Sequence, residues 1–246
     1  MSESIGPEVG EDEVIAFTRI RRLIAERMVQ SKAISPHTLM AKEIDYESVE
    51  QVRRTHGSQF RAEEGYGLSY LSFAACATVQ ALVEFPHLNA SVVDDALVVH
   101  RPINLGIAVE LEKGGLVVAV VSNAKELGLR EMARRIRDLA ERARAGRLGM
   151  EDISGGTFTI TNTGPFGTLM TGAIINQPEV AILATDGVTR RPVVVESTVG
   201  VESIVIRTVG VATINFDHRA VDGAYVARFL GRLGAILNER NWADEL

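Results

Sequence analysis

The stretch from Thr213 to Gly223, which reads T-I-N-F-D-H-R-A-V-D-G, limits the fold of this chain more than any other. An apolar segment ends there in a tight group of charged residues, and a helical pattern follows directly. The apolar positions on one face of that helix are Val226, Phe229 or Leu230, Leu233 and Leu237. The pattern therefore predicts a core strand that delivers His218 at its end, followed by an amphipathic helix.

His218 has two interpretations from this local pattern. Histidine titrates near physiological pH, so at the end of a core strand it can take and return a proton as a general base. In the structural interpretation, Asp222 only caps the following helix and His218 is hydrogen-bonded in a strand-to-helix turn. Both interpretations remain open at this point.

Charge and composition exclude some classes of partner. Hydrophobic residues make up 46% of the 246 residues, and 26 basic against 32 acidic residues give a net charge of -6. No basic stripe is interleaved with aromatic residues, which argues against nucleic acid as the main ligand. A local basic cluster is interpreted as the solvated face of a helix. It consists of Arg134, Arg135, Arg137, Arg142, Arg144 and Arg147.

The single cysteine and the absence of long apolar runs indicate the compartment. Cys76 lies inside an apolar run, so we expect a buried thiol rather than a nucleophile, and no intrachain disulfide. No run reaches the eighteen or so apolar residues of a membrane span, and the acidic N-terminus lacks the layout of a signal peptide. We therefore expect no membrane contact and a reducing, cytoplasmic location, or the mitochondrial matrix if the source is eukaryotic.

Along the chain, residues 1–17 are acidic and without periodicity, which predicts a flexible arm or linker remnant, and residues 18–246 form one domain. Helices are predicted over 19–35, 48–54, 68–85 and 129–147, and after 223. Strands are predicted over 38–44, 105–110, 116–121, 180–184, 193–195 and 204–214, at 174–175, and in a hairpin over 90–100. Helices alternating with antiparallel hairpins predict an α+β fold with a mixed sheet.

A second informative stretch, G-G-T-F-T-I-T-N-T-G-P-F-G, begins at Gly155. In a strand, Phe158 and Ile160 point to one face while Thr159 and Thr161 point to the other. Thr161 thus presents a hydroxyl on a polar face. Threonine is also common in strands because it is β-branched, so a purely structural interpretation stays open.

Several catalytic motifs are absent. The sequence contains no G-x-S-x-G elbow, phosphate loop, H-E-x-x-H pair or G-x-G-x-x-G fingerprint. His218 and Asp222 offer two ligands, but no third or fourth is evident, so we predict no metal site.

Four motifs carry a resemblance to a known family. D-H-R-A-V-D-G, G-G-T-F-T-I-T-N-T-G, A-I-I-N-Q-P-E-V-A-I-L and F-P-H-L-N-A-S resemble, in family order, the catalytic domain of the dihydrolipoamide acyltransferases. These are the core subunits of 2-oxo acid dehydrogenase complexes. The resemblance implies a fold like chloramphenicol acetyltransferase, a mixed sheet flanked by helices, and a trimer with active sites at subunit interfaces. Family trimers usually assemble further into a cubic or dodecahedral core.

The resemblance also implies a reaction, the passage of an acyl group between the sulfurs of dihydrolipoamide and coenzyme A. His218 matches the family's general base, which takes the thiol proton. Thr161 matches a hydroxyl donor to the oxyanion. Asp222 matches the acidic residue of the signature and orients its surroundings.

Four residues match the family's coenzyme A contacts: Arg53, Ser69, Asp94 and Asn162. Arg53 is suited to a phosphate group. Because family active sites are shared between subunits, the resemblance implies that His218 and Thr161 come from different chains.

The chain departs from the family in three respects. Full-length members carry a lipoyl domain and a small domain that binds the dehydrogenase partners, and we expect the lipoyl group to come from a domain absent from this chain. Residues 238–246 are polar where many relatives end in an apolar tail, which argues against the cubic assembly. Asp186 stands where relatives often have glycine, near the expected coenzyme pocket.

Two other functions are compatible with the sequence. One is a largely non-catalytic assembly scaffold, because a fold alone does not fix function. The other is a drug O-acetyltransferase of the same fold, against which the T-I-T-N-T-G and A-I-I-N-Q-P motifs argue. Thr161 and the neighbouring F-G-T-L-M favour a succinyl group as the acyl substrate.

Overall fold

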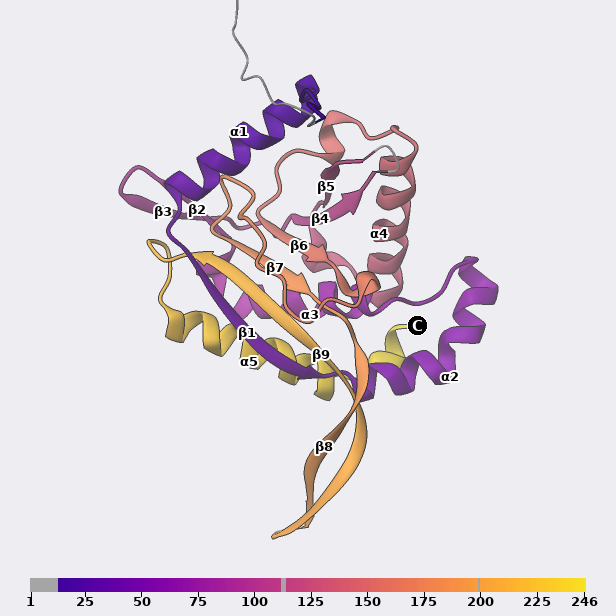
Figure 1. The fold of residues 1–246 in the computed structure, drawn as a ribbon. Helices are drawn as coiled ribbons and strands as arrows, with labels where there is room; N and C mark the ends of the chain where they lie inside the picture. The colour runs from indigo at the N-terminus through magenta and orange to yellow at the C-terminus, as the bar shows by residue number, and fades with distance from the viewer. Residues whose placement is uncertain (1–12, 112–113, 199) are drawn as a thin grey trace, which may run out of the picture.

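The computed structural model describes residues 13–111, 114–198 and 200–246, and Figure 1 shows their fold. Most of the arm predicted over residues 1–17 lies outside the described residues, which begin at 13. Residues 13–18 form no helix or strand and lead directly into the first helix.

The described part of the chain folds into helices and strands in mixed order. The helices are α1 (Arg19–Ile34), α2 (Glu47–Glu64), α3 (Tyr70–Glu84), α4 (Leu129–Arg144) and α5 (Gly223–Glu239). The strands are β1 (His37–Asp45), β2 (Ala90–Val93), β3 (Ala96–Val99), β4 (Leu105–Glu110), β5 (Leu116–Val121), β6 (Phe158–Asn162), β7 (Ala181–Thr185), β8 (Thr189–Thr198) and β9 (Val201–Asp217). A short 3₁₀ helix, Trp242–Glu245, follows α5.

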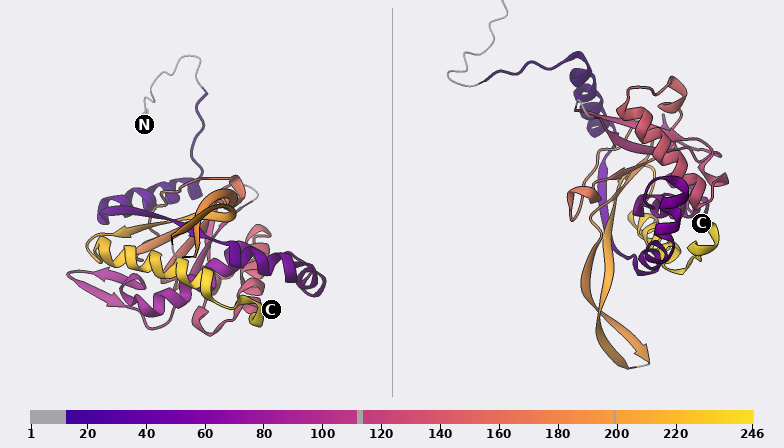
Figure 2. Two further views of the ribbon diagram at one scale, coloured as in Figure 1. Left: turned by 90° about the horizontal axis from the view of Figure 1, so that it is seen from below. Right: turned by 90° about the vertical axis from the view of Figure 1, so that its right-hand side faces the viewer.

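The main sheet contains seven strands in the order β1-β9-β7-β6-β4-β5, with β8 pairing to β9 off this path. Strand β6 runs parallel to β4 and β7, and the remaining pairings are antiparallel. Helices α4 and α5 lie on one side of the sheet, as the right-hand view of Figure 2 shows. The mixed α+β sheet predicted from the sequence is confirmed.

The core lies between this sheet and the helices. Phe158 and Ile160 of β6 are fully buried, and the Phe158 ring lies 6.2 Å from the Phe229 ring of α5. The apolar positions predicted for the face of α5 are buried, and both Phe229 and Leu230 are among them. Each such side chain contributes about 1.5–3 kcal/mol through removal of apolar surface from water. Helix α3 is buried on nearly every side, as predicted, and includes Cys76, whose pKa burial raises to about 12.

Local sequence explains where the helices begin and end. The Thr18 hydroxyl accepts the Arg21 N–H at 3.2 Å, so Thr18 caps α1. The helix stops before Pro36, which cannot continue it. Helix α2 was predicted to end at Arg54, but it continues to Glu64 and ends at Gly65, whose φ of +81° suits glycine.

The strand predicted at Ile174 and Ile175 is wrong. These residues lie in a segment that forms no helix or strand. The Ile175 N–H donates to Nε2 of His37 at 3.0 Å, and its C=O accepts the Ser31 hydroxyl at 2.7 Å. Side chains therefore satisfy the backbone groups that a neighbouring strand would have satisfied.

A long hairpin, the β8–β9 arm, extends beyond the body of the molecule (Figures 1 and 2). Strand β9 has 17 residues, and only its second half pairs with β1 and β7. The first half pairs with β8 alone. The arm exposes several large apolar side chains: Val194, Val201, Ile204 and Ile206.

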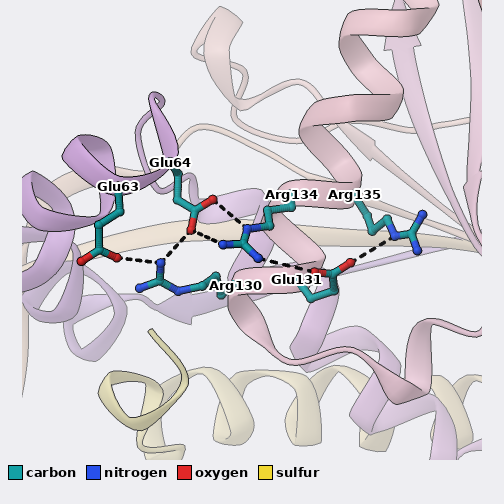
Figure 3. A network of polar contacts seen from close by, with 6 residues as sticks. All are labelled: Glu63, Glu64, Arg130, Glu131, Arg134 and Arg135. Atoms are coloured by element: carbon teal, nitrogen blue, oxygen red, sulfur yellow. Dashed lines mark hydrogen bonds and ion pairs between the residues drawn. The ribbon is translucent and has the colours of Figure 1, made fainter.

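A network of ion pairs joins the end of α2 to the start of α4 (Figure 3). The Glu64 carboxylate accepts hydrogen bonds of 2.7 Å from both Arg130 and Arg134. Most other arginines of the predicted cluster are exposed, and Arg135 pairs with Glu131 one turn away, whereas the partly exposed Arg142 also pairs with Asp152 after the helix. The interpretation of this cluster as a solvated helix face is confirmed.

The C-terminal residues fold back onto their own chain. Trp242 is buried, and its ring lies 5.2 Å from the ring of Phe73. Glu245 pairs with Arg240 and accepts the Leu129 N–H at 3.1 Å, at the start of α4. Within the described residues, no helix combines the length and the apolarity that crossing a bilayer requires.

Candidate active site

His218 follows the last residue of β9, as predicted. The preceding residue, Asp217, is buried, and its carboxylate accepts hydrogen bonds from the backbone and the guanidinium of Arg219. The His218 N–H donates to the Pro36 C=O at 3.2 Å, which ties the turn to the chain before β1. The turn is thus fixed on both sides, while the His218 side chain is exposed.

Asp222 occupies the N-cap position of α5, as the structural interpretation predicts. Its side chain makes no capping hydrogen bond. Its C=O instead accepts the N–H groups of Tyr225 and Val226 at 3.0 and 3.3 Å. The exposed Asp222 carboxylate is thus available to other partners near His218.

Thr161 lies on β6, half-buried, with its side chain on the sheet face opposite Phe158 and Ile160. In the ladder it stands level with Ala184 of β7, which stands level with Thr213 of β9. The predicted polar face is confirmed, since Thr159 and Thr213 share it.

Thr161 and His218 of one chain lie far apart. Asp217 is four residues beyond Thr213 along β9, which corresponds to about 13 Å. Strands β6 and β9 are separated by β7 alone, which adds two strand spacings, about 10 Å in total. The backbone of Thr161 is therefore roughly 16 Å from that of Asp217. The backbone of Thr161 is therefore well separated, within one chain, from the residue that precedes His218.

A cleft of about 280 Å³ opens beside the end of β6 and β7. Three of the four predicted coenzyme A residues line it: Arg53 from α2, Ser69 at the start of α3, and Asn162 from β6. The fourth, Asp94, lies in the β2–β3 turn with a φ of +51°, away from this cleft. The remaining lining residues are Tyr46, Tyr70, Leu71, Ala74, Gly164, Pro165, Thr185, Asp186 and Val188.

Arg53 is held in a fixed orientation on the wall of the cleft. Its Nη1 donates to Glu50 at 2.6 Å, and its Nε donates to the Leu68 C=O at 2.9 Å. The guanidinium carbon lies 3.9 Å from the centre of the Tyr70 ring. A guanidinium held in this way presents a preorganised positive charge to an anionic ligand.

Tyr70 lines the cleft beside Arg53, Glu50 bonds to both of them, and sequence reasoning missed Tyr70 and Glu50. The Tyr70 hydroxyl donates to Glu50 at 2.6 Å. Burial acts to raise the pKa of Glu50, but the hydrogen bond from Tyr70 and the charge of Arg53 outweigh it and hold that pKa below its usual range. Burial and the bond to Glu50 raise the pKa of Tyr70 to about 12, so it remains a donor. The only available signal was the spacing of Glu50 and Arg53, three residues apart on a helix.

Asn162 is oriented by its neighbours. Its side-chain oxygen accepts the Gly164 N–H at 3.1 Å and the Thr185 hydroxyl at 3.2 Å. Its amide nitrogen is therefore the group left to contact a ligand in the cleft. Among the described residues, no group of three His, Cys, Asp or Glu side chains is placed to hold a metal ion.

Comparison with known proteins identifies the family. The family model described as 2-oxoacid dehydrogenases acyltransferase (catalytic domain) matches residues 9–243. The chain is 37% identical over 226 residues to the lipoamide acyltransferase component of the branched-chain alpha-keto acid dehydrogenase complex of Bacillus subtilis, covering 92% of this chain and 52% of that protein. It is 35% identical over 225 residues to the dihydrolipoyllysine-residue succinyltransferase component of the 2-oxoglutarate dehydrogenase complex of Haemophilus influenzae, covering 92% and 54%. The chain thus spans about half the length of these curated relatives.

Solved structures agree in fold. A probable dihydrolipoamide acetyltransferase of Listeria monocytogenes matches with a TM-score of 0.87 at 35% identity, covering 94% of this chain and 97% of that one. The cubic core of a pyruvate dehydrogenase multienzyme complex matches with a TM-score of 0.87 at 29% identity, covering 97% and 98%. Chloramphenicol acetyltransferase matches with a TM-score of 0.54 at 14% identity, covering 86% and 94%, which confirms the predicted fold class. With its family motifs placed around the cleft and the end of β9, this chain belongs to the 2-oxoacid dehydrogenase acyltransferases and contains their catalytic domain.

Proposed function

We propose that this chain transfers an acyl group between coenzyme A and the dihydrolipoamide arm of a lipoyl domain. The observation that supports the proposal is the cleft in which Arg53, Ser69 and Asn162 converge at the end of β6. These residues come from α2, the start of α3, and β6, and each matches a coenzyme A contact of the family. The fixed guanidinium of Arg53 suits a phosphate of the coenzyme.

The reaction needs a base and an oxyanion donor. His218 takes the proton of the attacking thiol, and the thiolate adds to the thioester carbonyl to give a tetrahedral intermediate. The Thr161 hydroxyl donates a hydrogen bond to the oxyanion. When the intermediate collapses, the leaving sulfur takes the proton back from His218. Asp222, four residues after His218, orients the histidine's surroundings rather than exchanging protons.

We propose that the active site is built from two copies of the chain. The separation of about 16 Å between Thr161 and the end of β9 within one chain supports this, together with the exposed position of His218. The His218 of one copy then acts together with the Thr161 of a neighbouring copy. We propose a homotrimer, because a cyclic assembly gives every copy the same interface. On this basis Asp94, outside the cleft of its own chain, contacts the coenzyme only if another copy brings it there.

The partners follow from the same reaction. The lipoyl group comes from a lipoyl domain, and the trimers associate with the dehydrogenase components of a 2-oxo acid dehydrogenase complex, with or without a larger core. We place this activity in the cytoplasm. Coenzyme A acts as a substrate, and no metal takes part in the proposed mechanism.

The acyl group is proposed to be succinyl, on the strength of Thr161 and the F-G-T-L-M segment. One residue type in a pocket commonly changes discrimination by only about 1–3 kcal/mol, so the assay must compare donors directly. Acetyl-, succinyl- and isobutyryl-coenzyme A are offered side by side, and thioester formation on dihydrolipoamide is followed. The expected result is turnover that is fastest with the succinyl donor.

Variants then test the two catalytic assignments. His218→Ala should abolish turnover without unfolding the protein. Thr161→Val, which keeps the shape, should lower kcat on the order of 10²–10³-fold, whereas Thr161→Ser keeps the hydroxyl and should retain most activity. Undiminished exchange in His218→Ala would overturn the mechanism. A folded wild-type assembly that is silent with every donor would instead favour a scaffold or another acceptor, such as chloramphenicol.

A further inference from the structure

Asp186 has an unusual environment for a carboxylate. It directly follows β7, and its N–H donates to the Val211 C=O at 3.0 Å, which extends the pairing of β7 with β9. It lines the cleft, yet only 2% of the residue is exposed. A buried carboxylate is costly unless hydrogen bonds satisfy its oxygens.

Threonines supply those hydrogen bonds. Oδ1 of Asp186 lies 2.6 Å from the Thr171 hydroxyl, 2.7 Å from the Thr168 hydroxyl and 3.1 Å from the Thr163 hydroxyl. Oδ2 lies 3.2 Å from the Thr171 N–H and 3.4 Å from the Thr213 hydroxyl. None of these donors is charged. The Thr163 hydroxyl also contacts the hydroxyls of Thr168 and Thr171, so the carboxylate is the shared acceptor of the cluster.

Three of the four threonines lie on one segment, residues 163–171, which begins two residues after Thr161. Apart from a 3₁₀ turn at Gly164–Phe166, this segment has no helix or strand of its own. It is anchored at its first residue, near its middle and at its end, and each anchor reaches the same carboxylate. Side-chain hydrogen bonds to one group therefore take the place of a backbone ladder in setting its position.

The backbone of Asp186 and its neighbours closes the same connection. Gly187 donates its N–H to the Thr168 C=O at 2.8 Å, and Thr163 donates its N–H to the Thr185 C=O at 3.1 Å. A Cβ at Gly164 would lie 2.9 Å from the Asp186 C=O, so the segment approaches Asp186 closely at a point where only glycine fits.

The segment also forms part of the cleft. Gly164 and Pro165 line the cleft next to Asn162, whose side-chain oxygen holds the Gly164 N–H. Any shift of residues 163–165 therefore moves the cleft wall and the end of β6 together. The outer residues Phe166, Leu169 and Met170 are exposed by 71%, 63% and 56%, so no packing of their own holds the segment in place.

We infer that Asp186 is a positioning residue, which holds residues 163–171 through their threonines so that the cleft wall and the end of β6 keep the geometry that coenzyme A requires. The inference rests on the proposed function of the cleft. Asp186 acts through the segment and makes no contact with the reacting atoms. A contrary role, in which its negative charge repels the phosphates of the coenzyme, predicts the opposite change in affinity when the charge is removed.

The test uses the intact assembly and two sets of variants. Asp186→Asn removes the charge at constant shape, and Thr168→Val combined with Thr171→Val removes two donors and leaves Asp186 in place. The exposed Asp244→Asn serves as a matched control outside this region. Amide hydrogen exchange of residues 163–171 measures how firmly the segment is held and does not depend on enzyme activity. Calorimetric titration measures the affinity of the cleft for coenzyme A.

In both sets of variants, the amide hydrogens of residues 163–171 should exchange at least about fivefold faster, because each set loses hydrogen bonds that hold the segment. The exchange rates of α5 should not change. Coenzyme A should bind roughly ten- to a hundredfold more weakly. Adding Asp186→Asn to the double threonine variant should have little further effect, because all act through one cluster. If Asp186→Asn does not fold, the threonine variants alone carry the comparison.

Unchanged exchange in residues 163–171 would overturn the inference, as would faster exchange with unaltered coenzyme affinity. Tighter binding of coenzyme A to Asp186→Asn would show the repelling role instead. If the wild-type protein itself neither binds coenzyme A nor turns over, the proposed function fails, and the exchange comparison still decides whether Asp186 holds the segment.

Discussion

Asp217 and Arg219 form a two-pronged ion pair across His218. Nη2 of Arg219 lies 2.6 Å from Oδ2 of Asp217, and its Nε lies 3.0 Å from Oδ1. Burial acts to raise the pKa of Asp217, but the hydrogen bonds from Arg219 and Ser35 outweigh it and keep that pKa below its usual range. The residues on either side of the proposed base are thus locked to each other.

Breaking this pair should misplace His218 without removing it. In Asp217→Asn we expect kcat to fall roughly 10–100-fold with little change in KM for coenzyme A, because the base is displaced while the cleft is untouched. Arg219→Lys keeps the charge but loses the paired geometry, and should lie between Asp217→Asn and wild type. Steady-state kinetics on both variants provide the measurement. An unaltered kcat in Asp217→Asn would mean that the turn holds His218 without the ion pair.

Mixed assemblies test whether two copies share one active site. Chains carrying His218→Ala and chains carrying Thr161→Val are each expected to be inactive alone. When they are co-expressed in equal amounts, about a quarter of the interfaces combine an intact His218 with an intact Thr161 from the neighbouring copy. Activity should therefore return to about a quarter of the wild-type value. Pure assemblies mixed without subunit exchange are the control, and no recovery after co-expression would place both groups in one chain.

Arg53 should affect the binding of coenzyme rather than chemistry. Replacing it with Gln is expected to raise KM for coenzyme A about tenfold and to leave kcat nearly unchanged, because uniform binding is lost. Arg54→Gln is the matched control, since Arg54 also pairs with Glu50 at 2.9 Å but does not line the cleft. Equal effects of the two variants would show that only long-range charge matters.

Glu179 gives the protein a pH-dependent stability. Its burial raises the pKa to about 7 from 4.5, against the opposing hydrogen bonds of Thr159 and Asn176. Between about pH 4.5 and 7 the folded chain keeps a proton that the unfolded chain has lost. The free energy of unfolding therefore falls as pH rises through this window, by about 3 kcal/mol in total, and is level above it.

The side chain in Glu179→Gln cannot ionise, so this variant should not lose stability as the pH rises. Its free energy of unfolding minus that of wild type should therefore increase from about pH 5 to about pH 8, so that the variant gains stability relative to wild type, as measured by denaturant titration at each pH. Gln still has an oxygen to accept the Thr159 hydroxyl, so the comparison isolates the charge. Parallel pH profiles for the two proteins would contradict the prediction.

Sequence periodicity predicted the elements that bury one clear face, and it failed where side chains replace backbone pairing. The apolar positions of α5 were correct because helical spacing and burial coincide there. Ile174 and Ile175 resemble a strand because they are β-branched, yet the His37 ring and the Ser31 hydroxyl satisfy the Ile175 backbone. His56 and Gly57 weaken the helical pattern after Arg54, so the predicted helix ended too early. In the structure these residues do not break α2, which continues to Glu64.

The candidate site was predictable only as far as its motifs extend. Arg53, Ser69 and Asn162 were identified by resemblance, and the structure places them in one cleft. The contacts of Glu50 with Tyr70 and of Asp186 with its threonines join residues that are distant in sequence, and no local pattern encodes such pairings.

The β8–β9 arm has a consequence for how the protein responds to dilution. A two-stranded ribbon with no buried face is only marginally stable in water, so the outer half of the arm adds little to the stability of a single chain. Its apolar side chains, Ile204 and Ile206 among them, lose contact with water only if something covers them. Any such free energy comes from association and follows mass action, so Tm should rise with protein concentration.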